Sequence, residues 1–314
     1  MRFYKVKYSR EKEVCSITVT YNPNLTILKR QIIELTYQVE HIIIVDNGSK
    51  NIDDIISEFS CIEKVSIIRL DENMGIAYAQ NKGIKFAKSL TVTHVITFDH
   101  DSEIPKGFIS ELLASEQELL ALGERVAAVG PSFFNSNTNK NYPVPYLKNI
   151  PLLKGLIVGR KHFTNSQYLE SYFLIASGCL MRISVLNDIG LMDSELFIDN
   201  VDLEWCLRAQ IRGYKVFTTN RTSMSHLIGD STRKFLGRNI SVHSNIRKYY
   251  NTRNNLLLIR YDGIPLGLKV RMIPALFIRF LIGILDTENK NEYFKFYYWA
   301  IIDFLSNKKG KFKH

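Results

Sequence analysis

Two carboxylates, Asp99 and Asp101, stand one residue apart at the end of an apolar run, residues 93–98. The β-branched and aromatic residues of that run are typical of a buried strand, and open α/β sheets bind ligands where such strands end. Alternate side chains of an extended segment point to one face, so both carboxylates can converge on one ligand. Mg²⁺ and Mn²⁺ prefer oxygen ligands of this kind. The pair is suited to a divalent cation, but on this motif alone a polar turn, with the carboxylates solvated or capping the next helix, is the favoured interpretation.

A second acidic group lies in residues 197–208, which contain Asp199, Asp202 and Glu204. If this segment is helical, residues three or four apart share a face, so Asp199 and Asp202 would meet while Glu204 points elsewhere. Neighbouring carboxylates raise each other's pKa, which brings one of them toward the value that a general base needs. We therefore predict Asp202 as a general base. Acidic residues that merely favour the helix N-terminus are the alternative.

Polar residues also follow two earlier apolar runs. Asp46 precedes an Asn-Gly turn, and a carboxylate there can accept the ring N–H of a pyrimidine base; an ordinary turn is the alternative. Asn73 and Gly75 begin a segment with small residues on one face, which permits close approach to a phosphate or sugar or, alternatively, tight packing on a sheet. The glycine patterns of dinucleotide-binding and P-loop proteins are absent.

The elements that would position these residues alternate along the first part of the chain. Continuous apolar runs predict parallel strands, and helical spacing separates them. The expected fold is α/β, a doubly wound, Rossmann-like and mostly parallel sheet with right-handed crossovers. We predict strands at residues 14–21, 41–46, 65–70 and 93–99, and helices at 25–39, 52–59 and 76–89.

Composition narrows the class of protein. The chain has 314 residues, of which 46% are hydrophobic, as in a globular protein. Its cysteines, Cys15, Cys61, Cys179 and Cys206, lack the spacing of a zinc ribbon or disulfide framework and are typical of a reducing compartment. The N-terminus lacks the apolar core of a secretory signal, so we expect a cytoplasmic protein.

The net charge of +10 is unevenly placed. Residues 1–204 hold 21 Lys and Arg against 25 Asp and Glu, whereas residues 205–314 hold 20 against 6. Nucleic acid, an anionic membrane or a phosphate-bearing substrate could bind such a surface. No nucleic-acid-binding motif accompanies the charge, so we expect no nucleic-acid partner.

A basic, helical C-terminal region, residues 231–314, is predicted to follow a catalytic domain at residues 1–230. Its apolar run at residues 273–285 is shorter than the roughly 20 residues of a membrane span and contains Arg279. Helical spacing predicts an interfacial helix with Arg271 and Arg279 opposite the apolar stripe. Packing on the catalytic domain or a homodimer contact is the alternative. The predicted stripe comprises Ile273, Leu276, Phe277, Phe280, Leu281 and Ile284.

These motifs occur in an order that resembles a known family. Residues 20–23, 45–49, 73–83 and 98–102 resemble the nucleotide-sugar half of family 2 glycosyltransferases, which have the GT-A fold. Residues 176–181 resemble the acceptor segment of that family and residues 197–208 its acidic catalytic helix. Within the family, the phrases at 98–102 and 197–205 are most similar to bacterial rhamnosyltransferases of O-antigen and cell-wall polysaccharide assembly, whose donor is dTDP-L-rhamnose.

The resemblance implies an inverting transfer that needs a divalent cation, Mg²⁺ or Mn²⁺, held by Asp99, Asp101 and His226. Arg253, one of several basic residues after His226, could screen the leaving diphosphate. The expected donor-binding residues are Thr20, Tyr21, Asn22, Pro23, Asp46, Asn73, Gly75, Asp99 and Arg253.

The same resemblance assigns acceptor binding to Ser177, Gly178 and Asp199 and the role of base to Asp202. This chain has Val201 before Asp202, where many relatives have Glu, so the base role falls on Asp202 alone. His100 replaces a common Gln, and its role stays open.

The implied partners are a nucleotide-sugar donor and a saccharide acceptor, free or lipid-linked, in lipopolysaccharide O-antigen synthesis. A lipid-linked acceptor would place the enzyme peripherally on the inner face of the cell membrane. Two alternatives stay open: a transferase that uses UDP-galactofuranose or a UDP-hexose, and a non-catalytic nucleotide-binding module of the same fold.

Overall fold

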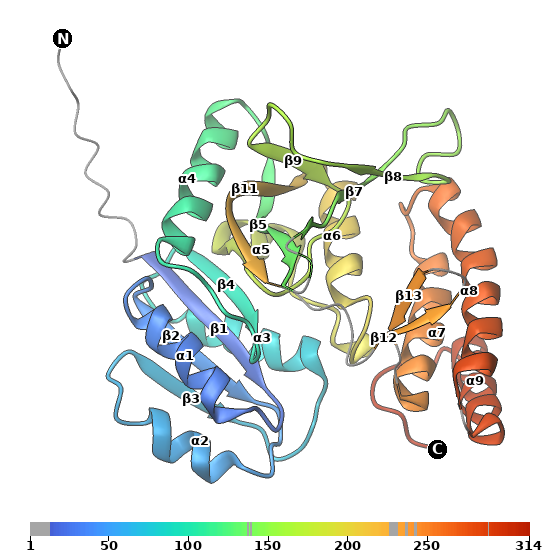
Figure 1. Ribbon diagram of the computed structural model, residues 1–314, viewed down its shortest axis with the longest axis horizontal. Helices are drawn as coiled ribbons and strands as arrows, with labels where there is room; N and C mark the ends of the chain where they lie inside the picture. The colour runs from blue at the N-terminus through green and yellow to red at the C-terminus, as the bar shows by residue number, and fades with distance from the viewer. Residues whose placement is uncertain are drawn as a thin grey trace.

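A twisted sheet forms the centre of the computed structural model, which describes residues 13–136, 138, 140–225, 232–235, 238–241, 244–287 and 289–314 (Figure 1). The strand order is β3-β2-β1-β4-β10-β5-β11-β9, with β6 paired to β5. The sheet consists of β1 (Val14–Thr20), β2 (His41–Asp46), β3 (Val65–Arg69), β4 (His94–Asp99), β5 (Val126–Asn135), β6 (Lys140–Asn141), β9 (Tyr168–Ser171), β10 (Cys179–Arg182) and β11 (Lys215–Ser225).

The first four strands run parallel, as predicted, because each is a continuous apolar run and a helix connects each strand to the next. β10 is antiparallel to both β4 and β5, so an inserted strand separates the two parallel parts. The predicted mostly parallel, doubly wound α/β fold is confirmed. Two small antiparallel pairs lie outside this sheet: β7 (Val144–Leu147) with β8 (Val158–Lys161), and β12 (Thr232–Phe235) with β13 (Arg238–Ser241).

Strand register brings three predicted site residues to one edge of the sheet. Thr20 is opposite Asp46 in the β1–β2 pair, and Val19 is opposite Asp99 in the β1–β4 pair. The carboxyl ends of the three strands therefore lie side by side, where open α/β sheets bind ligands.

Helices cover both faces of the sheet (Figure 1). One apolar core lies under α1, α2 and α4, and the other under α3, α5 and α6. The helices of the first two-thirds, including the 3₁₀ helix η2, are α1 (Leu25–Thr36), α2 (Ile52–Phe59), α3 (Ile76–Ala87), α4 (Phe108–Ala121), α5 (Ile183–Ile189), η2 (Ser194–Leu196) and α6 (Val201–Ile211).

Three helices complete the chain: α7 (Asn245–Arg260), α8 (Leu266–Asp286) and α9 (Lys290–Leu305). They lie side by side at one end of the molecule, to the right in Figure 1. Leu257 of α7 belongs to the same apolar core as β1 and α6, so this region packs closely on the sheet domain. The division at residue 230 stays a prediction. Among the described residues, no helix combines the length and apolar character needed to cross a bilayer.

Candidate functional site

The ends of β1 and β2 are joined through the carboxylate of Asp46, which is fully buried. Its Oδ1 accepts a hydrogen bond from Thr20 Oγ1 (2.9 Å) and its Oδ2 from the backbone N–H of Ser49 (2.9 Å). Ser49 Oγ in turn accepts from the N–H of Asn22 (2.8 Å). A carboxylate offers about four acceptor positions and these bonds use two of them, but Asp46 is closed to solvent here, so base binding by Asp46 stays a prediction. The structure thus brings together Thr20, Asn22 and Asp46, and Tyr21 beside them is exposed.

Asn73 and Gly75 form the turn before α3, and Asn47 holds this turn in place. Asn73 Oδ1 accepts from Asn47 Nδ2 (3.1 Å) and from the N–H of Gly75 (2.9 Å). Gly75 has φ +89°, and a Cβ atom there would lie 2.5 Å from the carbonyl oxygen of Phe197. The turn therefore requires glycine, and it connects the predicted donor side to the segment before α6. Neither Asn47 nor Phe197 is among the predicted site residues.

The turn that carries Asp99 and Asp101 is fixed by Gln31 of α1. Gln31 Nε2 donates to the carbonyl oxygens of Asp99 (2.8 Å) and Ser102 (2.9 Å). Burial, together with the nearby charge of Asp101, raises the pKa of Asp99 to about 6. Two carboxylates that repel each other in this way fit a divalent cation, which would neutralise both. Across the part of the chain that the structure describes, no cluster of three metal-ligating side chains occurs. His226 lies outside the described residues.

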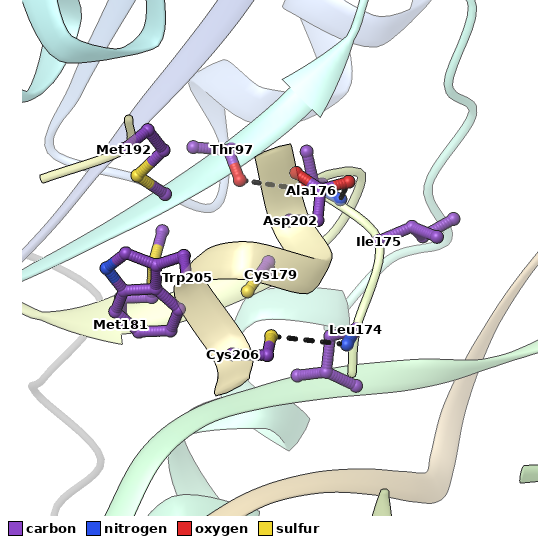
Figure 2. Close-up of a pocket in the computed structure, with 10 residues that line it drawn as sticks. All are labelled: Thr97, Leu174, Ile175, Ala176, Cys179, Met181, Met192, Asp202, Trp205 and Cys206. Carbon is purple, nitrogen blue, oxygen red and sulfur yellow. Dashed lines mark hydrogen bonds between the residues drawn. The ribbon is translucent and has the colours of Figure 1, made fainter. Parts of the chain in front are cut away.

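Asp202 lies in the first turn of α6 and lines a small pocket between β4, β10 and α6 (Figure 2). Its Oδ2 accepts from the N–H of Ala176 (3.0 Å), and the carbonyl oxygen of Ala176 accepts from Thr97 Oγ1 (2.5 Å). Burial and the charge of Asp99 raise the pKa of Asp202 to about 7, against the opposing effect of the hydrogen bond from Ala176. A carboxyl group with this pKa can accept a proton at neutral pH.

The expected helical pairing of Asp199 with Asp202 is wrong. α6 begins at Val201, and Asp199 and Asn200 both have φ +61°, in the left-handed region. Asp199 therefore leaves the helical path and pairs with Arg247 (3.3 Å). Among the charged neighbours of Asp202, Asp99 has a larger effect on its pKa than Asp199. The two acidic motifs thus meet across the fold and not along one helix.

The segment before α6 is strained and is held in place by α7. Phe197 has φ +64° and ψ −66°, and the N–H of Ile198 donates to the carbonyl oxygen of Leu196 (2.8 Å), which is a rare γ-turn. Asn254 Nδ2 donates to the carbonyl oxygens of Leu196 (2.8 Å), Ile198 (2.7 Å) and Asp199 (2.9 Å). Strained conformations persist only where the surrounding structure fixes them.

Arg253 has a different role from the predicted one. Its guanidinium is buried and donates to the carbonyl oxygens of Gly310 (2.7 Å) and Leu196 (3.3 Å) and to Asn254 Oδ1 (3.0 Å). All three of its nitrogens have protein acceptors, so this geometry does not support donor binding by Arg253. Instead, Arg253 fastens the C-terminal segment to the turn before α6.

The predicted acceptor residues Ser177 and Gly178 lie behind Asp202. Ser177 is buried, and its hydroxyl is hydrogen-bonded to that of Ser102. Gly178 has φ +79°, and its N–H donates to the carbonyl oxygen of Thr97 (2.8 Å). Both residues therefore position the adjacent Ala176 against Asp202. Direct contact with an acceptor stays a prediction.

Comparisons with known proteins agree with this geometry. The family described as Glycosyl transferase family 2 matches residues 15–190. The dTDP-rhamnosyl transferase RfbF of Shigella flexneri is 36% identical over 292 residues, which cover 92% of this chain and 94% of that protein. The poly-beta-1,6-N-acetyl-D-glucosamine synthase of Staphylococcus epidermidis is 25% identical over 211 residues, 65% of this chain and 47% of that protein.

Two solved structures share the fold. GalNAc-T7 with UDP, GalNAc and Mn²⁺ superposes with a TM-score of 0.59 at 14% identity and covers 95% of this chain and 58% of its own. S. aureus TarS 1–349 in complex with UDP-GlcNAc superposes with a TM-score of 0.54 at 14% identity, over 94% of this chain and 81% of its own. At these identities the similarity concerns the fold alone.

Proposed function

Since this chain belongs to glycosyl transferase family 2 and is a glycosyltransferase, we propose that it transfers L-rhamnose from dTDP-L-rhamnose to a saccharide hydroxyl with inversion. The similarity to RfbF over 92% of the chain supports the donor. One observation supports transfer assisted by a general base: the pKa of the Asp202 carboxyl group is raised to about 7. The charge of Asp99, at the sheet edge, contributes to this rise.

The donor would lie along the carboxyl ends of β1, β2 and β4. Asp46, with the turn at residues 20–23, would hold the thymine base, since its carboxylate has free acceptor capacity. Gly75 brings the backbone close, so Asn73 and Gly75 would contact the ribose or the phosphates.

Asp99 and Asp101 would hold a divalent cation, Mg²⁺ or Mn²⁺, with His226 as a predicted third ligand. Such a cation neutralises the diphosphate as it leaves. Mutual repulsion of the two carboxylates supports this assignment. GalNAc-T7, which shares the fold, was crystallised with Mn²⁺.

Asp202 would take the proton of the acceptor hydroxyl as that oxygen attacks the anomeric carbon. The new bond joins the acceptor oxygen to the anomeric carbon, and the bond to the diphosphate oxygen breaks on the opposite face. By analogy with glycoside hydrolysis, the transition state is oxocarbenium-like. The positions of Ala176 and Thr97 support this role, because they fix the carboxyl group of Asp202.

A panel of donors tests the proposal. We expect purified protein to hydrolyse dTDP-L-rhamnose faster than UDP-glucose, UDP-galactose or UDP-galactofuranose, measured as nucleoside diphosphate released. Faster release of nucleoside diphosphate from a UDP-sugar would show that the enzyme uses a UDP-sugar as its donor. Tight donor binding without turnover, when an acceptor is also present, would indicate a non-catalytic nucleotide-binding module.

We also propose that the enzyme attaches peripherally to the inner face of the cell membrane, where a lipid-linked acceptor of O-antigen synthesis would lie. The exposed stripe on α8 supports this but differs from the predicted stripe, because Leu276 is buried against the protein. Apolar surface of this size on one helix is typical of interaction sites. The exposed large hydrophobic residues of α8 are Leu266, Val270, Ile273, Phe277, Ile278, Leu281 and Leu285.

Vesicle flotation tests the attachment. We expect Phe277→Asp to lower the fraction that floats with anionic vesicles at least about threefold, since burial of such a ring contributes about 1.5–3 kcal/mol. Leu122→Asp is the matched control, because Leu122 is an exposed apolar side chain at the end of α4. Equal flotation of both variants would contradict membrane binding by α8. If wild-type protein does not float but forms dimers that Phe277→Asp dissociates, the stripe is a homodimer contact.

A further inference from the structure

Three arginines, Arg160, Arg271 and Arg279, lie around Tyr172 and are called the arginine cluster below. Arg160 is on β8 opposite Pro145 of β7, and the carbonyl oxygen of Pro145 accepts from the N–H of Tyr172 (3.2 Å). Arg271 precedes Met272, which packs in the same apolar cluster as Tyr172. Strand β8 and helix α8 therefore bring the cluster to one place, where the β7–β8 pair reaches toward α8 (Figure 1).

The charges of the cluster act on a common point. Burial raises the pKa of Tyr172, and the charges of Arg271, Arg279 and Arg160 oppose this rise. The side chain of Arg279 is exposed to solvent. Its Nη1 donates to Asn251 Oδ1 of α7 (2.7 Å), which holds the guanidinium in position.

The cluster lacks the counter-charges that other arginines have. Arg208 pairs with Glu204 (2.7 Å), Arg182 with Glu116 (2.9 Å) and Arg221 with Glu118 (2.7 Å). Within the described ranges, none of the three cluster arginines makes an ion pair with a carboxylate. Neighbouring guanidinium groups that have no carboxylate partner are suited to a phosphate, which accepts charge-assisted N–H bonds from arginine.

The position of the cluster relates it to the acceptor. Arg279 bonds Asn251 of α7, and Asn254, three residues further along α7, bonds the carbonyl oxygen of Asp199, so α7 connects the cluster to the segment before α6. α8 carries Arg271 and Arg279, and it also carries the exposed apolar stripe. An anion bound here would therefore lie beside the exposed apolar residues of α8.

We propose that the arginine cluster binds a phosphate or diphosphate group carried by the acceptor. The inference rests on the proposed transferase function. It adds to that function a binding site for acceptor charge that is separate from the predicted donor site at Asp46 and Asp99.

The test compares two acceptors that carry the same saccharide, one with and one without a diphosphate, both dissolved in detergent. For wild-type protein we expect the diphosphate to lower KM. For the double variant Arg271→Gln/Arg279→Gln we expect the KM of the diphosphate acceptor to rise about 10- to 100-fold, from the loss of charge-assisted hydrogen bonds. The KM of the phosphate-free acceptor and the rate of donor hydrolysis should not change.

The double variant Lys290→Gln/Lys295→Gln is the control, because it removes two exposed charges from α9 and leaves the cluster intact. A second readout needs no turnover: calorimetry with inorganic pyrophosphate, on protein whose donor site is filled with dTDP. We expect binding by wild type and by the lysine variant, and at least tenfold weaker binding by the arginine variant.

Several results would overturn the inference. One is an arginine variant that keeps the preference for the diphosphate acceptor and binds pyrophosphate as wild type does. Another is an equal rise in KM for both acceptors, which would show that the cluster binds the saccharide and not the diphosphate. A third is an arginine variant that loses only flotation with anionic vesicles, which would assign it to lipid headgroups. If wild type hydrolyses no donor but shows the pyrophosphate difference, the proposed function fails and the anion site stands.

Discussion

Asp202→Asn is expected to lower the rate of transfer by about 10²- to 10⁴-fold, the usual contribution of a general base. Asparagine has nearly the same shape but cannot accept the proton of the acceptor hydroxyl. Donor affinity, measured by calorimetry, should stay within a few-fold of wild type, because the base is needed only when the acceptor reacts. Transfer is followed as glycosylated product with a saturating donor.

The matched control for this variant is Asp199→Asn, which removes a carboxylate three residues away that lies outside α6. We expect a smaller loss, because Asp199 contributes least among the causes that raise the pKa of Asp202. Normal turnover by Asp202→Asn would remove Asp202 from the mechanism.

The pH dependence of wild type follows from the same group. Burial raises the pKa of Asp202 to about 7, and only the deprotonated carboxylate can act as a base. Transfer should therefore fall as the pH falls through about 7 and level off above it. This acidic limb should be absent from the residual activity of Asp202→Asn.

Asp101→Ala is expected to lower transfer by at least about 100-fold, because a cation at a leaving phosphate contributes several kcal/mol. A chelator should stop the wild-type reaction, and Mn²⁺ or Mg²⁺ should restore it. No metal concentration that rescues wild type should rescue the variant. Binding of Mn²⁺, followed by electron paramagnetic resonance, gives a readout that does not depend on activity.

Glu103→Ala is the control for the metal site. Glu103 lies two residues further along the chain, and its exposed carboxylate pairs with Arg30 (3.0 Å) at the surface, so its loss should leave metal binding and transfer nearly unchanged. Full wild-type activity in excess chelator would show that the reaction needs no metal, and the Asp99–Asp101 pair would need another role.

The sequence by itself determined the parallel part of the sheet and the strand ends that carry Asp46 and Asp99. Short, continuous apolar runs such as residues 41–46 predict these strands, because a central strand of a parallel sheet is buried on both faces. The order of parallel strands then fixes one ligand-binding edge. For this reason, motifs far apart in the chain could be placed together without coordinates.

Only the tertiary structure decided how the acidic groups meet. Periodicity predicted that Asp199 and Asp202 share a helical face, but left-handed backbone at residues 199 and 200 prevents this, and contacts from α7 hold that backbone. The charge with the largest effect on the pKa of Asp202, that of Asp99, comes from a strand about a hundred residues earlier. The roles of Arg253 and the arginine cluster likewise depend on packing between distant elements, and side-chain spacing along a sequence carries no information about such packing.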